Sequence, residues 1–164
     1  MSAPIKIVYS ILSNAAGVTS LVGTRLNPVR IPQESAFPAI SYNVVSIVAN
    51  PTNSGHSRTE FARVQVNTYA TSFADAIELS GQVRAAFDDA VTPDTYNSSY
   101  VQVIEYDGEN HTADDQAAFA GLYQISQDYL LNYIYTSPAP AAESFILLEN
   151  GDFVLLETGD KIII

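Results

Sequence analysis

Alternation of apolar and polar residues is clearest between residues 37 and 70. Two strand-like segments, FPAISYNVVSIVAN and FARVQVNTYA, flank the polar stretch PTNSGHSRTE at residues 51–60. In the second segment Val64 and Val66 fall on one side, with the period of two expected of a half-buried strand. The opposite side carries Arg63, Gln65, Asn67 and Tyr69. The pattern predicts a long β-hairpin with Val64 and Val66 in the core and an exposed loop at its tip.

Helical spacing precedes this hairpin. Ile5, Val8 and Leu12 recur at intervals of three or four residues after Pro4, which predicts a helix from about residue 3 to residue 14. Two glycines then bracket AAGVTSLVG, which predicts a short turn-rich piece. The following TRLNPVRIP predicts a short edge strand interrupted by proline.

A second helix is predicted from Ser72, which would cap it, to about residue 90. Its apolar residues form a wide stripe that should lie on the sheet: Phe73, Ala76, Ile77, Leu79, Val83, Ala86 and Phe87. Alternation then predicts strands at residues 100–106 and 119–135, separated by the acidic loop DGENHTADD at residues 107–115. The predicted fold class is α+β: a mainly antiparallel sheet with a long hairpin, packed against two helices, plus a short C-terminal β-meander.

The C-terminal part of the chain is repetitive. FILLENGD at residues 145–152 is nearly repeated by FVLLETGD at 153–160, and KIII begins a third copy. Each unit predicts a short apolar strand followed by a turn. The preceding SPAPAAES predicts an extended linker. The chain therefore divides into an α+β domain at 1–136, a linker at 137–144 and a β-repeat appendage at 145–164.

The apolar residues of this repeat need a partner, because short strands are marginal alone. We expect the repeat to dock on its own domain, on a neighbouring subunit or on another protein. An alternative is that the third copy only adds a strand to the sheet of the domain.

Composition limits the function. The net charge is −11, with only seven Lys and Arg residues, which argues against a protein that grips nucleic acid. The absence of cysteine excludes disulfides and cysteine-ligated zinc. No apolar run reaches the length of a bilayer span, and the N-terminus lacks the apolar region of a secretory signal, so we expect a soluble protein without a membrane partner.

Motifs for chemistry are sparse. His56 and His111 are the only histidines and fall in separate predicted loops, so neither has an evident partner for catalysis. The acidic stretch at residues 107–115 lacks the ligand spacing of a calcium loop and is interpreted as a solvated turn. No phosphate-binding loop or nucleophile motif is found in the sequence. We expect no catalytic residue, cofactor or metal, and hence no enzyme.

The order of elements and several segments resemble the tail-terminator or tail-completion proteins of long-tailed bacteriophages, the group that includes minor tail protein U-like rings. The segments are VTSLVGTRLNP at 18–28, FPAISYNVV at 37–45, ARVQVNTYATSFADAIELSGQVRAAF at 62–87 and a late tyrosine-rich strand. The resemblance spans about residues 4–135. The C-terminal repeat is not part of it.

This resemblance implies a virion structural protein at the tail–neck junction, assembled in the host cytoplasm. It would form a homo-oligomer, usually a hexameric ring, at the head-proximal end of the tail tube. There it would end polymerisation of the tube protein and meet a neck or head-completion protein, while DNA passes without specific binding. Candidate residues for subunit or partner contacts are Asn53, His56, Arg58, Arg63, Gln65, Tyr69, Phe145, Leu147, Phe153 and Leu155.

Two other functions remain open. One is a different neck or tail-tube component of the same virion. The other is a monomeric binding module whose hairpin tip and tyrosines take a small ligand or a glycan.

Overall fold

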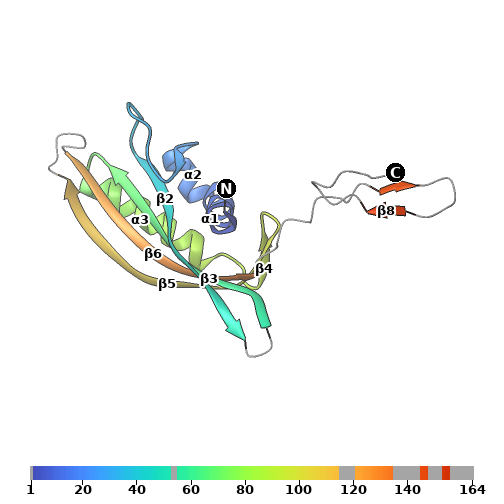
Figure 1. Cartoon of the computed structure of the whole chain (residues 1–164). Helices are drawn as coiled ribbons and strands as arrows, with labels where there is room; N and C mark the ends of the chain where they lie inside the picture. The colour runs from blue at the N-terminus through green and yellow to red at the C-terminus, as the bar shows by residue number, and fades with distance from the viewer. Residues whose placement is uncertain (1, 53–54, 115–120, 135–144, 148–152, 156–164) are drawn as a thin grey trace.

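The computed structural model of the 164-residue chain describes residues 2–52, 55–114, 121–134, 145–147 and 153–155. In these ranges the chain forms three helices, a six-stranded sheet and a separate two-stranded sheet. The helices lie together on one side of the long sheet, whose strands curve around them (Figure 1). The predicted α+β class is confirmed.

The six-stranded sheet has the order β1-β2-β3-β6-β5-β4. Its strands are β1 (Leu26–Pro28), β2 (Ala39–Thr52), β3 (Gly55–Ala70), β4 (Asp94–Tyr96), β5 (Ser99–Asp114) and β6 (Leu122–Ile134). β1 pairs with β2 in parallel, and every other pair in this sheet is antiparallel. The predicted long hairpin is therefore the β2–β3 pair, and β6 lies between its second strand and β5.

The first predicted helix is confirmed as α1 (Ala3–Asn14), which buries Ile5, Val8 and Leu12. The turn-rich piece predicted after it is wrong, because Ala16–Val22 forms a helix, α2. Val18 and Val22 lie one turn apart and are fully buried, so tertiary packing stabilises this short helix. The sheet therefore packs against three helices rather than two.

α2 approaches α3 (Phe73–Asp88) closely at Gly17. A Cβ atom at Gly17 would lie 1.9 Å from Oε1 of Gln82. That separation is far shorter than any van der Waals contact, so a side chain at this position would push the two helices apart or displace Gln82. The glycine that suggested a turn in the sequence instead lies within a helix, where its lack of a side chain leaves room for Gln82.

α3 begins as predicted, with the side chain of Ser72 accepting a hydrogen bond of 3.1 Å from the backbone N–H of Asp75. The predicted apolar stripe is wrong in part. Phe73 and Ile77 are 49% and 42% exposed, whereas the face of the helix that packs on the sheet consists of Ala76, Leu79, Ser80, Val83 and Phe87. The ring of Phe87 stacks on Tyr129 of β6 with centroids 3.9 Å apart.

The core lies between the helices and every second residue of the central strands. Val64 and Val66 of β3 are fully buried, as predicted. β6 alternates strictly from Ile125 onward, with every second residue through Tyr133 buried against the helices. The main buried cluster joins α1, α2 and α3 to all four long strands.

Two stretches predicted as loops are largely strand. β3 begins at Gly55 and pairs with β2 through Thr52↔Gly55 and Pro51↔His56, so the predicted loop at 51–60 is mostly hairpin. β5 continues through the acidic stretch to Asp114, which pairs with Leu122. Polar residues are accommodated there because Glu109 reaches Gln127 on β6 and Asp107 reaches Arg63 on β3. The histidines at 56 and 111 therefore lie on strands, not in loops.

The repeat at the C-terminus forms β7 (Phe145–Leu147) and β8 (Phe153–Leu155), paired antiparallel through Ile146↔Val154. This agrees with the two short strands expected there. The predicted linker at 137–144 and the third copy of the repeat lie outside the described residues, and the division of the chain into three parts stays a prediction.

Within the described ranges, no single helix has the length and apolarity to cross a membrane. The bent pair α1 and α2, with 86° between the two helices, meets that test only by length and composition.

Candidate assembly surface

The face of the six-stranded sheet opposite the helices is called the open face. Because alternate residues of a strand point to opposite faces, the residues next to the buried Val64 and Val66 belong to it. Pairing aligns these with equivalent positions on β6, through Arg63↔Leu130, Gln65↔Asp128 and Tyr69↔Gln124. The predicted contact residues Arg63, Gln65 and Tyr69 thus lie on one surface.

Arg63 is the centre of a charged cluster on the open face. Its Nη2 atom is 2.8 Å from Oδ2 of Asp128 and 2.9 Å from Oδ2 of Asp107. Gln65 Nε2 donates a hydrogen bond of 3.1 Å to the other oxygen of Asp128. The hydrogen bond with Asp128, followed by the charges of both carboxylates, raises the pKa of Arg63. The cluster ties β3, β6 and β5 together by side chains.

Asp107 reaches this cluster because the β5–β6 ladder is irregular. Tyr106 pairs with Tyr129 and Gly108 with Asp128, so Asp107 is an extra residue between two successive pairs. An inserted residue of this kind bends a strand and turns side chains to new directions.

A second polar group extends the open face toward the other end of the sheet. Gln124 Nε2 donates to Oδ1 of Asn67 at 3.2 Å and to Oγ of Ser126 at 2.9 Å. Asn67 Nδ2 in turn donates to Oδ1 of Asn43 at 3.4 Å. Side-chain amides therefore link β2, β3 and β6, giving the open face a uniform, uncharged polar character there.

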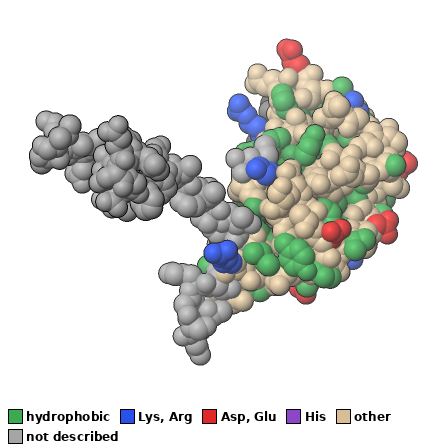
Figure 2. Space-filling model, turned by 90° about the vertical axis from the view of Figure 1, so that its right-hand side faces the viewer, with side chains coloured by type: hydrophobic (Ala, Val, Ile, Leu, Met, Phe, Trp, Pro, Cys, Tyr) green, Lys and Arg blue, Asp and Glu red, His purple; other side chains and the backbone are tan. Residues whose placement is uncertain are grey.

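Apolar residues gather toward the hairpin end of the sheet. Val45, Ile47 and Val48 of β2 are 53%, 44% and 60% exposed, and Phe61, which pairs with Val48, is 42% exposed. On the face drawn in Figure 2, hydrophobic side chains occur at several places on the described surface, and acidic and basic side chains are few and scattered. Exposed apolar groups of this kind favour contact with another protein surface.

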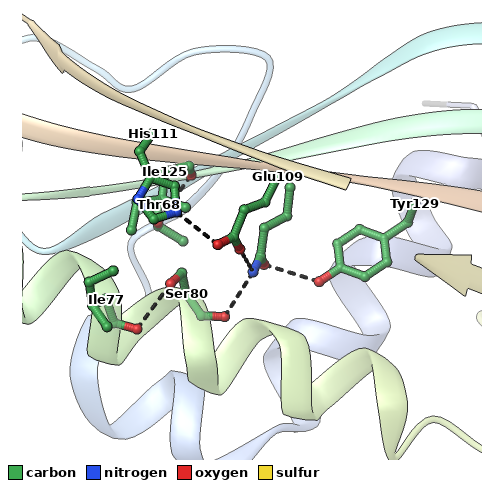
Figure 3. Close-up of polar contacts among 8 residues, drawn as sticks. Thr68, Ile77, Ser80, Glu109, His111, Ile125 and Tyr129 are labelled. Atoms are coloured by element: carbon green, nitrogen blue, oxygen red, sulfur yellow. Dashed lines mark hydrogen bonds and ion pairs between the residues drawn. The ribbon is translucent and has the colours of Figure 1, made fainter. Parts of the chain in front are cut away.

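The covered face holds a separate polar network between β6, β5 and α3. The buried Gln127 donates from Nε2 to the backbone oxygen of Ser80 at 3.2 Å and to Oε2 of Glu109 at 3.0 Å. The hydroxyl of Tyr129 donates to Oε1 of Gln127 at 3.0 Å. Ser80, Glu109 and Tyr129 converge on this amide in Figure 3. All polar atoms of the amide have partners, so the network fixes the sheet against α3.

Glu109 also meets His111, with 2.7 Å between its Oε1 atom and Nε2 of the histidine. The hydrogen bond from Gln127, and then the contact with His111, lowers the pKa of Glu109. The ring of His111 lies 6.1 Å from that of Phe73. These contacts explain why an acidic stretch continues as a strand along α3.

The other predicted contact residues are placed less completely. Arg58 is exposed near the hairpin end of β3. His56 lies in β3, but the structure does not describe its side chain. Asn53 is outside the described residues. The four residues of the repeat meet in cross-strand pairs, Phe145↔Leu155 and Leu147↔Phe153. Their role in contacts stays a prediction.

Sequence reasoning missed the acidic partners of Arg63. Asp107 was assigned to a loop, and Asp128 was only one member of an alternating strand. One signal for these partners was available. Alternation places Gln124, Ser126 and Asp128 on one side of β6, and this side forms one face with the polar side of β3 once the two strands pair.

A groove of about 540 Å³ lies between the α1–α2 corner, the end of α3 and β4. Asn14, Gln82, Asp89 and Tyr96 are among its lining residues. It contains none of the predicted contact residues, and it lies apart from the hairpin tip where the binding-module alternative placed a ligand. Among the described residues, no group of three His, Asp or Glu side chains is placed to hold a metal ion.

Comparison with known proteins places this geometry in context. The family model described as Tail completion protein gp17 matches residues 6–125. In structure the chain is similar to a chain of a particle described as "Virion of native gene transfer agent (GTA) particle", with a TM-score of 0.65 and 14% sequence identity, over 79% of this chain and 93% of that chain. At this identity the similarity shows a shared fold. No curated protein sequence matches the chain.

Proposed function

This chain belongs to the tail completion protein gp17 family, and from that premise we propose that its copies form a hexameric ring at the head-proximal end of a phage tail tube. The protein is a structural component of the virion tail. In the proposed role, the ring stops polymerisation of the tube protein and joins the tail to a neck or head-completion protein, at the tail–neck junction of a virion assembled in the host cytoplasm. This role requires no catalytic step, cofactor or metal.

The observation that carries the ring is the presence of two different unpaired edges on one sheet. β1 covers β2 only at Ile40–Tyr42, and β4 covers β5 only as far as Val101. Beyond these short strands, the outer edges of residues 43–52 and 102–114 pair with no other described strand. Edges that differ from each other suit heterologous contacts, in which a subunit presents one surface to one neighbour and a different surface to the next, and such contacts close into a ring when the rotation between subunits permits.

The charge of the subunit fits a channel for DNA. The chain carries a net charge of −11, and Arg63 is already paired with two carboxylates. Phosphate groups that pass such a surface meet like charge, so DNA is not held tightly. Passage without specific binding is therefore part of the proposal.

Negative-stain electron microscopy and light scattering on the purified full-length chain test the ring. We expect discrete rings and a mass of six chains. Long helical tubes would instead support a tube component, because that contact does not close. A stable monomer at micromolar concentration would overturn the ring and support the monomeric binding module.

A further inference from the structure

The outer edge of β2 from residue 43 to residue 50 is uncharged. Its sequence, NVVSIVAN, contains no acidic or basic side chain, and Val45 and Val48 are more than half exposed. Native sheets protect such edges with charges, because unpaired N–H and C=O groups accept a further strand. The ladder shifts register between Val44 and Ser46 and again between Ala49 and Pro51, and pairing with β3 is regular from Ser46 to Ala49.

The outer edge of β5 differs in charge. Glu105, Asp107 and Glu109 lie along it, and the ladder shifts register twice, after Val101 and after Tyr106. Register shifts occur along both edges, so the acidic side chains are the feature that hinders the addition of a strand to β5. Of the two long edges in the described sheet, only that of β2 is open to an apolar strand.

The C-terminal repeat supplies strands without a sheet to join. β7 and β8 pair only with each other among the described strands, as a two-stranded sheet separate from the six-stranded one. A hairpin of two short strands has little stability in water. The repeat also lies beyond residues 6–125, the part of the chain that the family model matches.

Charge directs the repeat to β2 rather than to β5. Its apolar strands are followed by Glu149 and Asp152 in the first copy and by Glu157 and Asp160 in the second. Like charges on neighbouring strands are destabilising, which disfavours the acidic edge of β5. The uncharged edge of β2 has no such penalty, and its exposed valines offer apolar cross-strand neighbours.

β6, the last strand before the repeat, ends at the same end of the sheet as residues 43–50 of β2. Ile134, the last residue of β6, pairs with Thr59, while the next residue of β3, Glu60, pairs with Ala49 of β2. Two strand spacings, about 10 Å, separate β6 from β2. Residues 135–144 span at most about 36 Å when extended, more than these two strand spacings.

We propose that the C-terminal repeat of one copy adds as a strand to residues 43–50 of β2 in a neighbouring copy. In the described structure β7 and β8 do not pair with β2 of their own chain, whereas the copies that the proposed function brings together offer this edge to one another. This inference rests on the proposed function, which supplies the neighbouring subunit. It assigns the repeat a part in assembly as a strand exchanged between subunits.

The chain has no cysteine, so introduced cysteines report specific proximity. Two full-length variants, Val48→Cys carrying an affinity tag and Ile146→Cys without one, are co-expressed and treated with a short bismaleimide. We expect a cross-linked dimer of tagged and untagged chains. The matched control replaces Val48→Cys with Glu105→Cys on the edge of β5, and should give several-fold less of this dimer.

Equal yields with Val48→Cys and Glu105→Cys would overturn the inference, as would cross-linking only within one chain in the double variant V48C/I146C. Electron microscopy of the same samples separates the two proposals. Rings without preferential cross-linking at Val48 would overturn the strand exchange and leave the ring intact. Monomers in every sample would overturn both.

Discussion

Arg63 on β3 places one guanidinium nitrogen 2.8 Å from Asp128 on β6, the strand next to it on the open face. The same nitrogen contacts Asp107 on β5, so a single basic residue bridges two carboxylates from two other strands and offsets one of their two charges. All three side chains are partly exposed, and exposed ion pairs contribute little to folding. We therefore expect the cluster to matter more for the charge of the surface than for the stability of the sheet.

Replacement of Arg63 by Gln tests this expectation. The variant should keep the thermal midpoint of the wild type but form fewer rings, because Asp107 and Asp128 then leave unbalanced negative charge on the proposed contact surface. Circular dichroism and light scattering give the two readouts. Arg84→Gln is the matched control, since Arg84 pairs with Asp88 on α3, away from the open face. Unchanged ring formation in Arg63→Gln would place the subunit contact elsewhere.

Gln127→Ala should destabilise the fold. The change removes the amide that bonds Ser80, Glu109 and Tyr129, and it takes from the buried hydroxyl of Tyr129 the oxygen to which it donates. Such a loss costs about 1–3 kcal/mol of unfolding free energy. Urea denaturation measures it.

The control for this change is Gln124→Ala on the open face, where water can replace the lost bonds to Asn67 and Ser126. Equal losses in the two variants would show that the network against α3 has no special role.

Acidification should weaken the contribution of Glu109. Its pKa is lowered from the ordinary value of 4.5, chiefly by the hydrogen bond from Gln127. A carboxylate with a lowered folded-state pKa stabilises the fold fully above its unfolded-state pKa, and this contribution disappears as the pH falls through the lowered value. The difference in unfolding free energy between wild type and Glu109→Gln should therefore be largest above pH 4.5 and shrink below it.

Urea denaturation at a series of pH values measures this difference. Glu105→Gln, on the other face of the same strand, controls for the removal of one negative charge. A difference for Glu109→Gln that stays constant or grows on acidification contradicts the prediction.

A lysine on the free edge of β2 should block assembly. Val48→Lys places a charge where a further strand would pair, and because Val48 is 60% exposed the folded subunit should tolerate it. We expect a folded monomer by light scattering and circular dichroism. Val91→Lys, at a position 68% exposed and outside the strands, is the control and should still form rings. Rings of Val48→Lys would exclude this edge from the subunit contact.

Deletion of residues 137–164 should leave the six-stranded sheet and its helices folded, because the described core cluster already joins all three helices to the four long strands. Assembly should be impaired, since the strands that we propose to be exchanged are lost. Thermal unfolding and electron microscopy measure the two effects. An unfolded truncated chain would show that the repeat belongs to the core.

The parts of the fold that follow simple periods were predictable from the sequence. Val64 and Val66 alternate with polar neighbours, and Ile5, Val8 and Leu12 follow a helical spacing, so one buried face specified each element. The family match likewise confirms the resemblance drawn from segments between residues 18 and 87. These segments lie in the elements that form the core.

Elements whose stability depends on partners far along the chain were not predictable in this way. The short helix α2 buries only Val18 and Val22, and it forms because these two residues pack into the core. Residues 107–114 contain too many acidic groups to indicate a strand, yet Glu109 finds Gln127 and Asp107 finds Arg63 across the ladder. The Arg63 cluster itself requires the order β3-β6-β5, which no local pattern contains.

The pairing of β3 with β6 begins at Thr59, whereas its pairing with β2 extends further toward the hairpin tip, to Thr52↔Gly55. Between Thr59 and the tip the described sheet is only two strands wide, and a ribbon of two strands bends and twists more readily than a broad sheet. The projecting segment can therefore bend, whereas the broader part of the sheet is held by its packing against the helices. In the ring that we propose, this bending would let the hairpin end follow the surface that it meets without disturbing the packed core.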